Sequence, residues 1–447
     1  MGTSTGTPAR SRPRQGAELE LEIDSLAQGG RGIARADGYV VFVAGALPGD
    51  RVRARITKSK RDYGEGRVVD LLRPSAERVA TSCLHDGEPC PGALWQGLPY
   101  ERQLEHKADQ VGDALRRLGR LDGFELEPIE PASERWRYRN KLEYSFGERD
   151  GELVLGLHRR GSWHEVVDVD DCLLASPRNN LARNEVRAWA REGGIPAYDR
   201  RSQAGVLRNL IVREGLRTGQ IQTRLVTSAA EIPRPPVDLH TVVQGSGGGT
   251  DGATGVLGAE HLDEEIGGLR FQVSHAAFLQ TNTEMAERLY AIAGDHAGLS
   301  GRERVFDLFC GIGTIGLALA RRAGEVWGLE SVPEAVADAA ENTRRNAIEN
   351  ARFIAADARL GIRPLIEEAG RPDVVVVDPP RAGLSKKIVR RLIECESRRI
   401  VYVSCNPTTL APNARQLVDA GYRLRRVKPV DMFPQTPHVE CVALLER

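Results

Sequence analysis

The sequence predicts an α/β protein built from an N-terminal β-barrel, a central α+β region and a C-terminal doubly wound sheet. From about residue 302, short apolar runs alternate with amphipathic segments, which is typical of a parallel sheet covered by helices. Residues 17–76 instead hold about five short runs separated by glycine turns, a pattern that indicates a small barrel of the OB type. A chain of 447 residues is long enough for about three such domains.

Composition excludes several classes of protein. The chain is 41% apolar and 28% charged, as expected of a globular protein. Its longest apolar runs, such as Val374–Val377, are too short to cross a bilayer, so we expect no membrane partner. Seven cysteines, an odd number, fit a reducing cytoplasm better than a disulfide framework. Residues 1–16 lack an apolar core and predict a flexible basic tail rather than a secretory signal.

Charge is balanced over the whole chain but not within the predicted barrel. Lys+Arg and Asp+Glu both total 62, so the net charge is zero and no field of the whole molecule would attract nucleic acid. A local basic face is still possible, because the stretch 51–61 carries six cations and no acid. This stretch is either a solvated edge strand or one wall of a nucleic-acid groove.

The central region, residues 77–300, is expected to mix antiparallel strands with helices. A helix over about 100–118 ends near Gly119, and a second helix ends at Gly193-Gly194. The glycine-rich segment 245–255 predicts a flexible loop. Strands are expected within 138–147, 153–160, 164–174, 209–215 and 220–227.

The C-terminal domain, residues 301–447, is predicted in more detail. The last two of its strands have no helix between them, so they should form an antiparallel pair at one edge. Its seven expected strands lie within 304–311, 325–330, 352–357, 373–380, 399–405, 423–433 and 440–447. Its four expected helices lie within 314–324, 332–350, 384–396 and 408–421.

A cofactor site is expected at the carboxyl ends of the parallel strands, where doubly wound sheets bind their ligands. Three glycines, Gly311, Gly313 and Gly316, have the spacing of a dinucleotide-binding turn, so a nicotinamide oxidoreductase fits the spacing alone.

Carboxylates at successive strand ends favour a different cofactor. Asp307 precedes the glycine turn and suits an ammonium group better than a pyrophosphate. Glu330 could bind ribose hydroxyls, and Asp357 could meet an adenine amine. Together these acids suit S-adenosylmethionine, which carries an ammonium and a sulfonium but no phosphate.

Three further residues predict the chemistry. Cys405 stands at a strand end before a proline turn, near Asp378 in the neighbouring strand end and Glu440 at the start of the seventh strand. A thiolate that adds to C6 of uracil raises the electron density at C5, which can then attack a sulfonium methyl group. A carboxylate such as Glu440 could then remove the C5 proton. The base must leave its stack to reach such a pocket.

Several strings resemble motifs of the RNA uracil-5-methyltransferase family, and residues 17–76 resemble a TRAM domain, an RNA-binding barrel. The strings are AFLQTNTE (277–284), DLFCGIGT (307–314), DPPRAGL (378–384), VYVSCNPTTLA (401–411) and DMFPQTPHVE (431–440). The resemblance implies that Cys405 is the nucleophile and Glu440 the base. It also implies that S-adenosylmethionine is held by Gln280, Phe309, Thr314, Glu330, Asp357 and Asp378.

The TRAM-like barrel favours a ribosomal-RNA enzyme, with 23S rRNA as the expected substrate. The cysteine usage predicts a cytoplasmic location, and a monomeric state is the default expectation. A tRNA uridine-5-methyltransferase is the alternative within the family. An RNA-binding factor whose methylation activity is vestigial is the alternative outside it.

Many members of the family hold an iron–sulfur cluster, and this chain departs from their pattern. Cys83, Cys90 and Cys172 match three ligand positions, but Ala93 occupies the remaining one, so a four-thiolate site lacks one ligand. His85 could substitute, and three cysteines with one histidine also suit zinc. The expectation is a cluster site, intact or degraded.

Overall fold

The computed structural model describes residues 12–447 except 84, 86–89, 229–231, 234–240 and 247–252. The chain divides into two compact units. Unit 1 is formed by Met1–Ser82, Ala93–Gln110 and Pro434–His438, and unit 2 is formed by Cys83–Gly92, Val111–Phe433 and Val439–Arg447.

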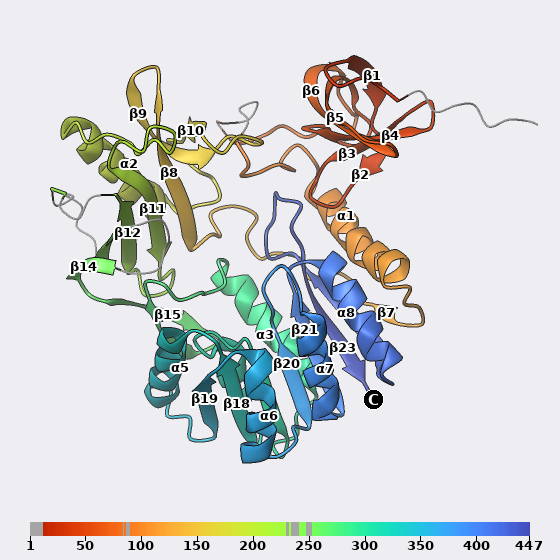
Figure 1. Ribbon diagram of the computed structural model, residues 1–447, viewed down its shortest axis with the longest axis vertical. Coiled ribbons are helices and arrows are strands. Elements are labelled where there is room, and N and C mark those ends of the chain that lie inside the picture. Colours follow the sequence, from red (N-terminus) through yellow and green to blue (C-terminus); the bar gives the residue numbers. More distant parts are fainter. Residues whose placement is uncertain (1–11, 84, 86–89, 229–231, 234–240, 247–252) are drawn as a thin grey trace, which may run out of the picture. The chain divides into compact units, whose positions relative to one another are not determined.

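Unit 1 contains a β-barrel-like sheet with the strand order β1-β5-β6-β4-β3-β2 (Figure 1). All neighbours are antiparallel except β4 and β6, which are parallel. Its apolar core includes Leu21, Val41, Val52 and Ile56. The strands are β1 (Glu18–Glu22), β2 (Ser25–Leu26), β3 (Gly32–Ala36), β4 (Tyr39–Ala44), β5 (Arg51–Ser59) and β6 (Tyr63–Arg73).

The basic stretch forms β5 and ends in the turn that follows. Because β5 pairs with β1 on one side and β6 on the other, the edge-strand interpretation is wrong. Most of its cations also have acidic partners on neighbouring strands. These pairs are Arg51–Glu20 at 2.9 Å, Arg53–Asp70 at 2.8 Å, Arg55–Glu18 at 2.7 Å and Lys58–Glu65 at 3.1 Å.

Two further predictions for the first 120 residues can be compared with the structure. The Arg12 guanidinium donates to the Ser59 hydroxyl at 2.9 Å, so the end of the predicted tail packs on the barrel, whereas residues 1–11 lie outside the described part. The predicted helix is α1 (Tyr100–Asp113), and a single π-helical turn (Ala114–Leu118) continues it up to Gly119.

The central part of unit 2 is a seven-stranded sheet with the order β10-β9-β8-β11-β12-β13-β14. The helix α2 (Pro177–Glu192) contacts it through a hydrogen bond of 2.8 Å from the Tyr144 hydroxyl to Asn179. The predicted loop 245–255 is strand at both ends, and its residues 247–252 lie outside the described part. The strands are β8 (Lys141–Arg149), β9 (Glu152–His158), β10 (Val166–Asp168), β11 (Leu207–Glu214), β12 (Ile221–Thr227), β13 (Thr241–Ser246) and β14 (Ala253–Gly258).

The rest of unit 2 is built on an eight-stranded sheet with the order β19-β18-β17-β20-β21-β23-β22-β7. The expected antiparallel pair is β22 and β23, although the two-residue strand β7 (Glu125–Leu126) adds outside it. The other strands are β17 (Arg304–Leu308), β18 (Glu325–Glu330), β19 (Ala351–Ala355), β20 (Val374–Val377), β21 (Arg399–Ser404), β22 (Arg423–Val430) and β23 (Glu440–Glu446).

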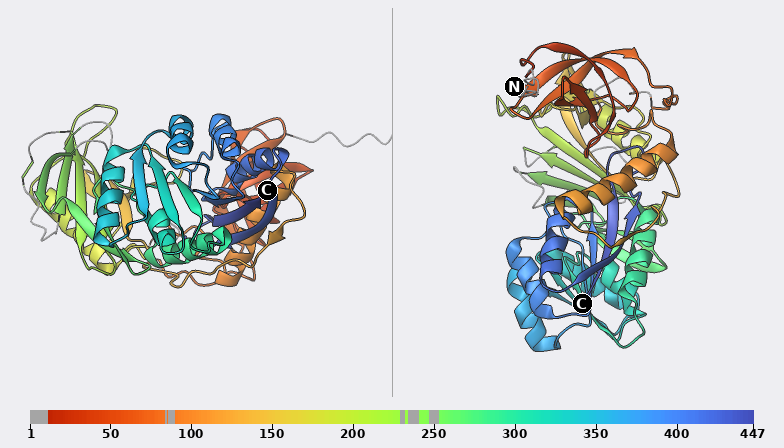
Figure 2. Two further views of the ribbon diagram at one scale, coloured as in Figure 1. Left: turned by 90° about the horizontal axis from the view of Figure 1, so that it is seen from below. Right: turned by 90° about the vertical axis from the view of Figure 1, so that its right-hand side faces the viewer.

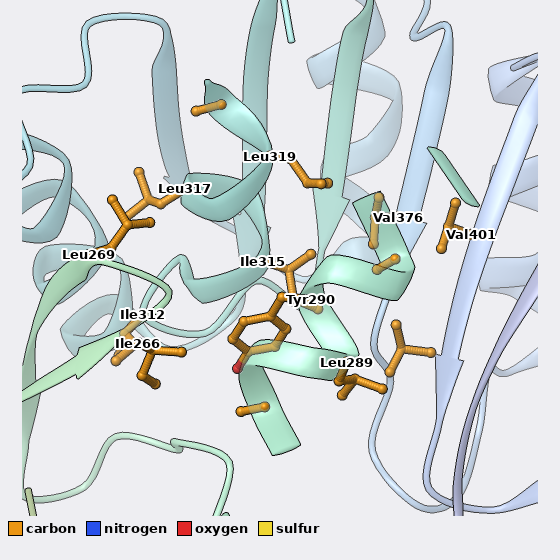
Figure 3. Close-up of a cluster of buried hydrophobic side chains, with 14 of the residues drawn as sticks. Ile266, Leu269, Leu289, Tyr290, Ile312, Ile315, Leu317, Leu319, Val376 and Val401 are labelled. Carbon is orange, nitrogen blue, oxygen red and sulfur yellow. The ribbon is translucent and has the colours of Figure 1, made fainter. Parts of the chain in front are cut away.

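Helices cover both faces of this sheet (Figure 2). One face packs on α3 (Thr283–Ala297), α4 (Thr314–Ala320) and α5 (Pro333–Arg345). The other face packs on α6 (Ala358–Ala369), α7 (Lys386–Cys395) and α8 (Pro407–Asp419). Figure 3 shows the first of these cores, in which Leu289 and Tyr290 of α3 lie near Ile315 of α4 and Val376 of the sheet. A hairpin of β15 (His261–Ile266) and β16 (Leu269–Ser274) precedes α3.

The helix α6 was not among the predicted helices. Gly361 and Pro364 lie inside it, and both residues are unfavourable in helix interiors. Its buried residues Ile362 and Leu365 pack against the sheet, and this tertiary packing outweighs the local preference.

Candidate active site

The parallel strands β17, β18, β20 and β21 all end at one edge of the eight-stranded sheet, and the antiparallel strand β23 begins there. The side chains that follow these strands therefore share one edge, as expected of doubly wound sheets. Most of the predicted site residues lie in these connections.

The turn after β17 is shaped for close approach to a ligand. Phe309 has φ +63°, a left-handed conformation that is costly for a bulky side chain and is found mostly where function requires it. Gly313 has φ +83°. A Cβ atom on Gly316 would lie 2.8 Å from Asp307 Oδ2, so only glycine allows the Gly316 N–H to donate to that carboxylate at 2.8 Å.

A small cavity of about 30 Å³ opens at the end of β17. It can take only the small end of a nucleoside-sized ligand, so the rest of such a ligand must lie along the open strand ends. Its lining joins four predicted positions, Gln280, Phe309, Thr314 and Asp378, to Asp307. It also includes Phe278, Leu279, Tyr290, Cys310, Gly311, Ile312 and Ile315.

Two carboxylates of this cavity, those of the fully buried Asp307 and the half-buried Asp378, have no basic partner among the described residues. Burial raises the pKa of Asp307 to about 8, and the nearby charges of Asp378 and Glu330 add to the shift. Burial also raises the pKa of Asp378 to about 6, although the Gln280 amide, which donates to Asp378 at 3.4 Å, partly offsets this. A cationic ligand would supply the charge that these carboxylates lack.

The other two predicted acids have local partners. Glu330 accepts hydrogen bonds from the N–H groups of Ser331 and Val332 through one oxygen and from Gly311 N–H through the other. This ties the end of β18 to the glycine turn. Asp357 caps α6 by accepting from Arg359 N–H at 2.8 Å, and it is not part of the cavity lining. Its adenine-binding role stays a prediction.

Cys405 and Glu440 are brought together by strand register. Ser404 lies opposite Cys441 in the antiparallel pair of β21 and β23, so the next position places Cys405 opposite Glu440. Cys405 is half-buried in the turn before α8, whose N-cap is Asn406, and Glu440 is only 3% exposed.

Burial and neighbouring charges raise the pKa of both groups. The pKa of Cys405 is raised to about 11, mainly by burial and also by the charges of Glu440 and Asp378, whereas Arg381 opposes the shift. Burial and the charge of Asp378 also raise the pKa of Glu440 well above its usual value, and Arg381 again opposes the shift. Both shifts favour the protonated forms of the thiol and the carboxyl when no cation is bound beside them.

Sequence reasoning missed three residues of this edge. Tyr290 is buried in the cavity and hydrogen-bonds to Thr314. Phe278 is 63% exposed although it lines the cavity. Arg381 carries a positive charge that opposes the rise in the pKa of both Cys405 and Glu440. Phe278 and Arg381 stand inside strings that were singled out, whereas nothing in the sequence marks Tyr290.

The cysteines of the predicted cluster lie elsewhere in unit 2. Cys83 Sγ lies 3.9 Å from His85 Nδ1. Cys83 and Cys172 both contribute to the raised pKa of Arg137. Within the part of the chain that the structure describes, no three His, Cys, Asp or Glu residues gather as metal ligands. The remaining ligand position of the family's cluster is Ala93 rather than a cysteine, so Cys83, Cys90 and Cys172 do not complete a four-thiolate cluster.

The fold and the site define a class: a Rossmann-like α/β protein with a thiol and several carboxylates at the ligand-binding edge of its sheet. Comparisons with known proteins narrow this class to one family. The family model described as tRNA (Uracil-5-)-methyltransferase matches residues 257–447, and the TRAM domain model matches residues 12–69. An uncharacterized RNA methyltransferase of Halalkalibacterium halodurans is 38% identical over 96% of both chains. The chain therefore belongs to the RNA uracil-5-methyltransferase family.

Two more relatives agree with this assignment. An uncharacterized RNA methyltransferase of Porphyromonas gingivalis is 38% identical over 96% of this chain and 99% of its own. The crystal structure of a Pyrococcus abyssi tRNA (uracil-54, C5)-methyltransferase in complex with S-adenosyl-L-homocysteine is 28% identical. It superposes with a TM-score of 0.78 over 95% of this chain and 99% of its own. The expected Rossmann-like methyltransferase fold with an N-terminal TRAM domain is confirmed.

None of the helices described here is both long and apolar enough to span a bilayer.

Proposed function

We propose that this protein transfers the methyl group of S-adenosylmethionine to C5 of a uridine in RNA, through a covalent bond between Cys405 and C6 of the uracil. The observation that carries the proposal is the register that sets Cys405 opposite Glu440, at the sheet edge where Asp378 ends β20. A nucleophile, a base and a cation-binding carboxylate at one edge are the groups that this reaction requires.

The bound donor supplies an electrophilic methyl group on a positively charged sulfur. Asp307 and Asp378 suit this cation, because Asp307 is buried, Asp378 is half-buried, and no basic side chain among the described residues neutralises either of them. The Gln280 side chain donates a hydrogen bond to Asp378. The backbone carbonyl of Gln280 accepts a hydrogen bond of 2.9 Å from the Asn140 side-chain amide, which fixes its position. The fit rests on charge and does not require a metal.

The residues of the chain divide the reaction into two halves. In the first, the Cys405 thiol loses its proton to solvent, so that Glu440 stays ionised for the later step, and its sulfur forms a bond to C6 while the C5–C6 π electrons move toward O4 to give an enolate. C5 then forms a bond to the methyl carbon as the sulfonium–methyl bond breaks, and the electron pair of that bond stays on the sulfur of S-adenosylhomocysteine, which leaves uncharged. In the second half, Glu440 removes the proton from C5, the C5–C6 double bond forms again, and the sulfur leaves with its electron pair. The balance is one methyl group gained and one proton lost at C5.

The high pKa of Cys405 is consistent with this order of reaction steps. The two groups that raise it after burial are Glu440 and Asp378, both carboxylates. A cation bound beside them would lower their effect, and the thiol would become more acidic only when the donor is present. The thiol would therefore be activated in the loaded protein and protected in the empty one.

Ribosomal RNA, and 23S rRNA first, is the proposed substrate because the resemblance of residues 17–76 to a TRAM domain favours it. Transfer RNA is the second candidate. The tRNA enzyme of Pyrococcus abyssi aligns with 95% of this chain, so the barrel is compatible with a tRNA substrate as well. Mapping of 5-methyluridine by mass spectrometry in rRNA and tRNA from cells that lack the protein would decide between them.

We propose that the protein is located in the cytoplasm, because seven cysteines, an odd number, fit a reducing compartment, and that it is a monomer. Light scattering of the purified chain tests the monomer. The partial cysteine set Cys83, Cys90 and Cys172 stays a prediction. Iron, sulfide and zinc analysis of anaerobically purified protein tests it, and the proposed reaction uses no step through a cluster.

The decisive experiment replaces the thiol. Cys405→Ala is expected to reduce methyl transfer to unmodified RNA by at least about 10³-fold, because the nucleophile is lost. The native chain, but not the variant, should form a stable adduct with RNA containing 5-fluorouridine, because fluorine at C5 cannot be removed as a proton. Cys395→Ala, which changes a buried thiol on α7, is the matched control and should retain activity.

Two outcomes would overturn the proposal. Full activity in Cys405→Ala would remove the covalent mechanism. No methyl transfer by the native chain to any RNA, combined with RNA binding, would instead favour the RNA-binding factor.

A further inference from the structure

A basic groove lies between α6 and α7, outside the cavity of the candidate active site. Its volume is about 360 Å³, and it is lined by Arg359 and Leu360 of α6 and by Lys387, Arg390 and Arg391 of α7. Four of these five residues are cationic, and the fifth, Leu360, is an apolar side chain that is 66% exposed. We call this feature the α6–α7 groove.

One side of the groove is held in a fixed geometry. Arg391 Nη1 donates to both oxygens of Glu394 at 2.7 and 2.8 Å, and its Nε donates to the carbonyl of Arg359 at 3.4 Å. Arg363 of α6 reaches the same Glu394 at 3.0 Å. These contacts tie the two helices together, so the groove has little freedom left to lose when it binds a ligand.

Two of the remaining three cations of the groove have no acidic partner among the described residues. Lys387 and Arg390 form no ion pair with any of the residues that the structure describes, and Arg359 has only Asp357, at 3.6 Å. The helices α6 and α7, with the N-cap Asp357, carry six cations, at 359, 363, 386, 387, 390 and 391, against four acids, at 357, 367, 368 and 394, and none of the four acids lines the groove. The groove therefore has a local excess of positive charge in a chain of zero net charge.

The position of these cations is unfavourable for the helix itself. Two lysines stand in the first turn of α7 and no acid does, although the positive end of the helix dipole favours anions there. The charges cost stability unless an anion is bound, and so they point to a ligand rather than to a structural role. Backbone N–H groups at the start of α7 would add to such an anion site.

The groove also lies on the edge of the sheet where the chemistry is proposed. The helix α6 begins directly after β19, and α7 begins after the short connection that leads away from Asp378. Both helix N-termini therefore face the edge that carries Asp378 and Cys405. A strand of RNA whose target base is bound at Cys405 has its neighbouring phosphates within reach of this edge.

We propose that the α6–α7 groove binds phosphate groups of the RNA strand that flank the target uridine, with Lys387 and Arg390 as the direct contacts. This inference rests on the proposed function, because it takes RNA as the substrate. Leu360 offers an apolar surface to a ribose or a base. The groove carries no sequence readout, since phosphates are the same at every nucleotide.

The test compares two double variants of the full chain. Lys387→Gln/Arg390→Gln removes the two unpaired cations of the groove. Arg302→Gln/Arg321→Gln, the matched control, removes two exposed arginines near the start of β17 and the end of α4, at the opposite edge of the sheet. Binding of a fluorescein-labelled 20-nucleotide polyuridylate is measured by anisotropy over a range of salt concentrations, and methyl transfer is measured on unmodified rRNA and tRNA.

The groove variant should bind polyuridylate about tenfold more weakly at 0.1 M salt. The slope of log Kd against log salt should fall by about 1.4, at about 0.7 for each single-strand phosphate contact. Its KM for RNA should rise while kcat and the affinity for S-adenosylhomocysteine stay unchanged, because the reacting groups are untouched. The control should match the native chain in every measurement.

An unchanged slope and Kd in the groove variant, or an equal loss in the control, overturns the proposal. The failure of the proposed function is separately visible, because a native chain that methylates no RNA would still give a binding slope. A native chain that methylates RNA while the groove variant shows an unaltered KM refutes the groove alone.

Discussion

The charged residues of the barrel and those of the sheet edge differ in whether they have a partner of opposite charge. In the barrel, Arg51, Arg53 and Arg55 each have an acid on a neighbouring strand, within 2.9 Å. At the sheet edge, the buried Asp307 and the half-buried Asp378 have no cation beside them in the described residues, and their pKa values rise instead. The paired charges connect neighbouring strands, whereas the unpaired carboxylates are the ones that we propose to bind the cationic donor. Charge content in the sequence does not distinguish the two cases; pairing in the fold does.

The sheet-edge half of this comparison is tested most strongly at Glu440. Glu440→Gln is expected to lower the rate of methyl transfer by about 10²–10⁴-fold, because the amide cannot accept the C5 proton. The bond between Cys405 and uracil would still form, so a covalent complex with ordinary RNA should accumulate and appear as a shifted band in denaturing gels.

Glu446→Gln, at the other end of the same strand, is the control and should retain activity. A Glu440→Gln variant that turns over at the native rate would contradict the role of this carboxylate as the base.

The second prediction concerns pH. Because the pKa of Asp307 is raised to about 8, this group holds a proton in the ligand-free protein at neutral pH, whereas Asp378, with a pKa of about 6, takes up its proton only as the pH falls through about 6. A cationic donor favours their ionised forms, so binding should release protons, and the affinity should rise as the pH increases from about 5.5 to 7.5. We expect up to about a tenfold change per pH unit for each proton released.

Calorimetry with S-adenosylmethionine in buffers of different ionisation enthalpy measures this release. Asp378→Asn should bind the donor about tenfold more weakly at pH 7.5, with a flatter pH dependence. The donor titrates identically with both proteins, so the difference between them reports Asp378. Parallel pH profiles for the two proteins would contradict the assignment.

The smallest effect is expected in the barrel. The side chains of Arg53 and Asp70 are 42% and 50% exposed, and such pairs contribute about 0.2–1 kcal/mol. A double-mutant cycle with Arg53→Gln and Asp70→Asn, followed by urea unfolding, should therefore give a coupling below about 1 kcal/mol that disappears in 1 M salt.

A coupling of several kcal/mol would show that the barrel pairs are not ordinary surface pairs, and the contrast with the sheet edge would fail. If Arg53→Gln lowered the RNA affinity much more than Lys387→Gln/Arg390→Gln does, RNA binding would be assigned to β5 despite its ion pairs.

Much of the sheet could be predicted because its strands are apolar runs and its helices are amphipathic. The missed helix α6 shows the limit: Gly361 and Pro364 argue against a helix locally, and only contacts with distant strands stabilise it. The basic strand β5 shows the same limit for charge. Its acidic partners Glu18, Glu20 and Asp70 are 17 to 37 residues away in sequence from the arginines that they pair with, and the pairing appears only in the folded register.

The candidate site follows a similar division. Cys405, Asp378 and Glu440 could be singled out because each stands at a predicted strand end. Tyr290 could not, because an apolar helix position gives no sign that its hydroxyl reaches Thr314 across the core. The α6–α7 groove could not either, since it requires α6.

The pairing of β21 with β23 has a consequence for how the protein becomes active. Cys405 and Glu440 are 35 positions apart in the chain and meet only through the register of these two strands. A slip of a single residue would turn Glu440 to the other face of the sheet while Cys405 stayed in place. Recovery of activity during refolding should therefore lag behind collapse and report the insertion of β23 between β21 and β22.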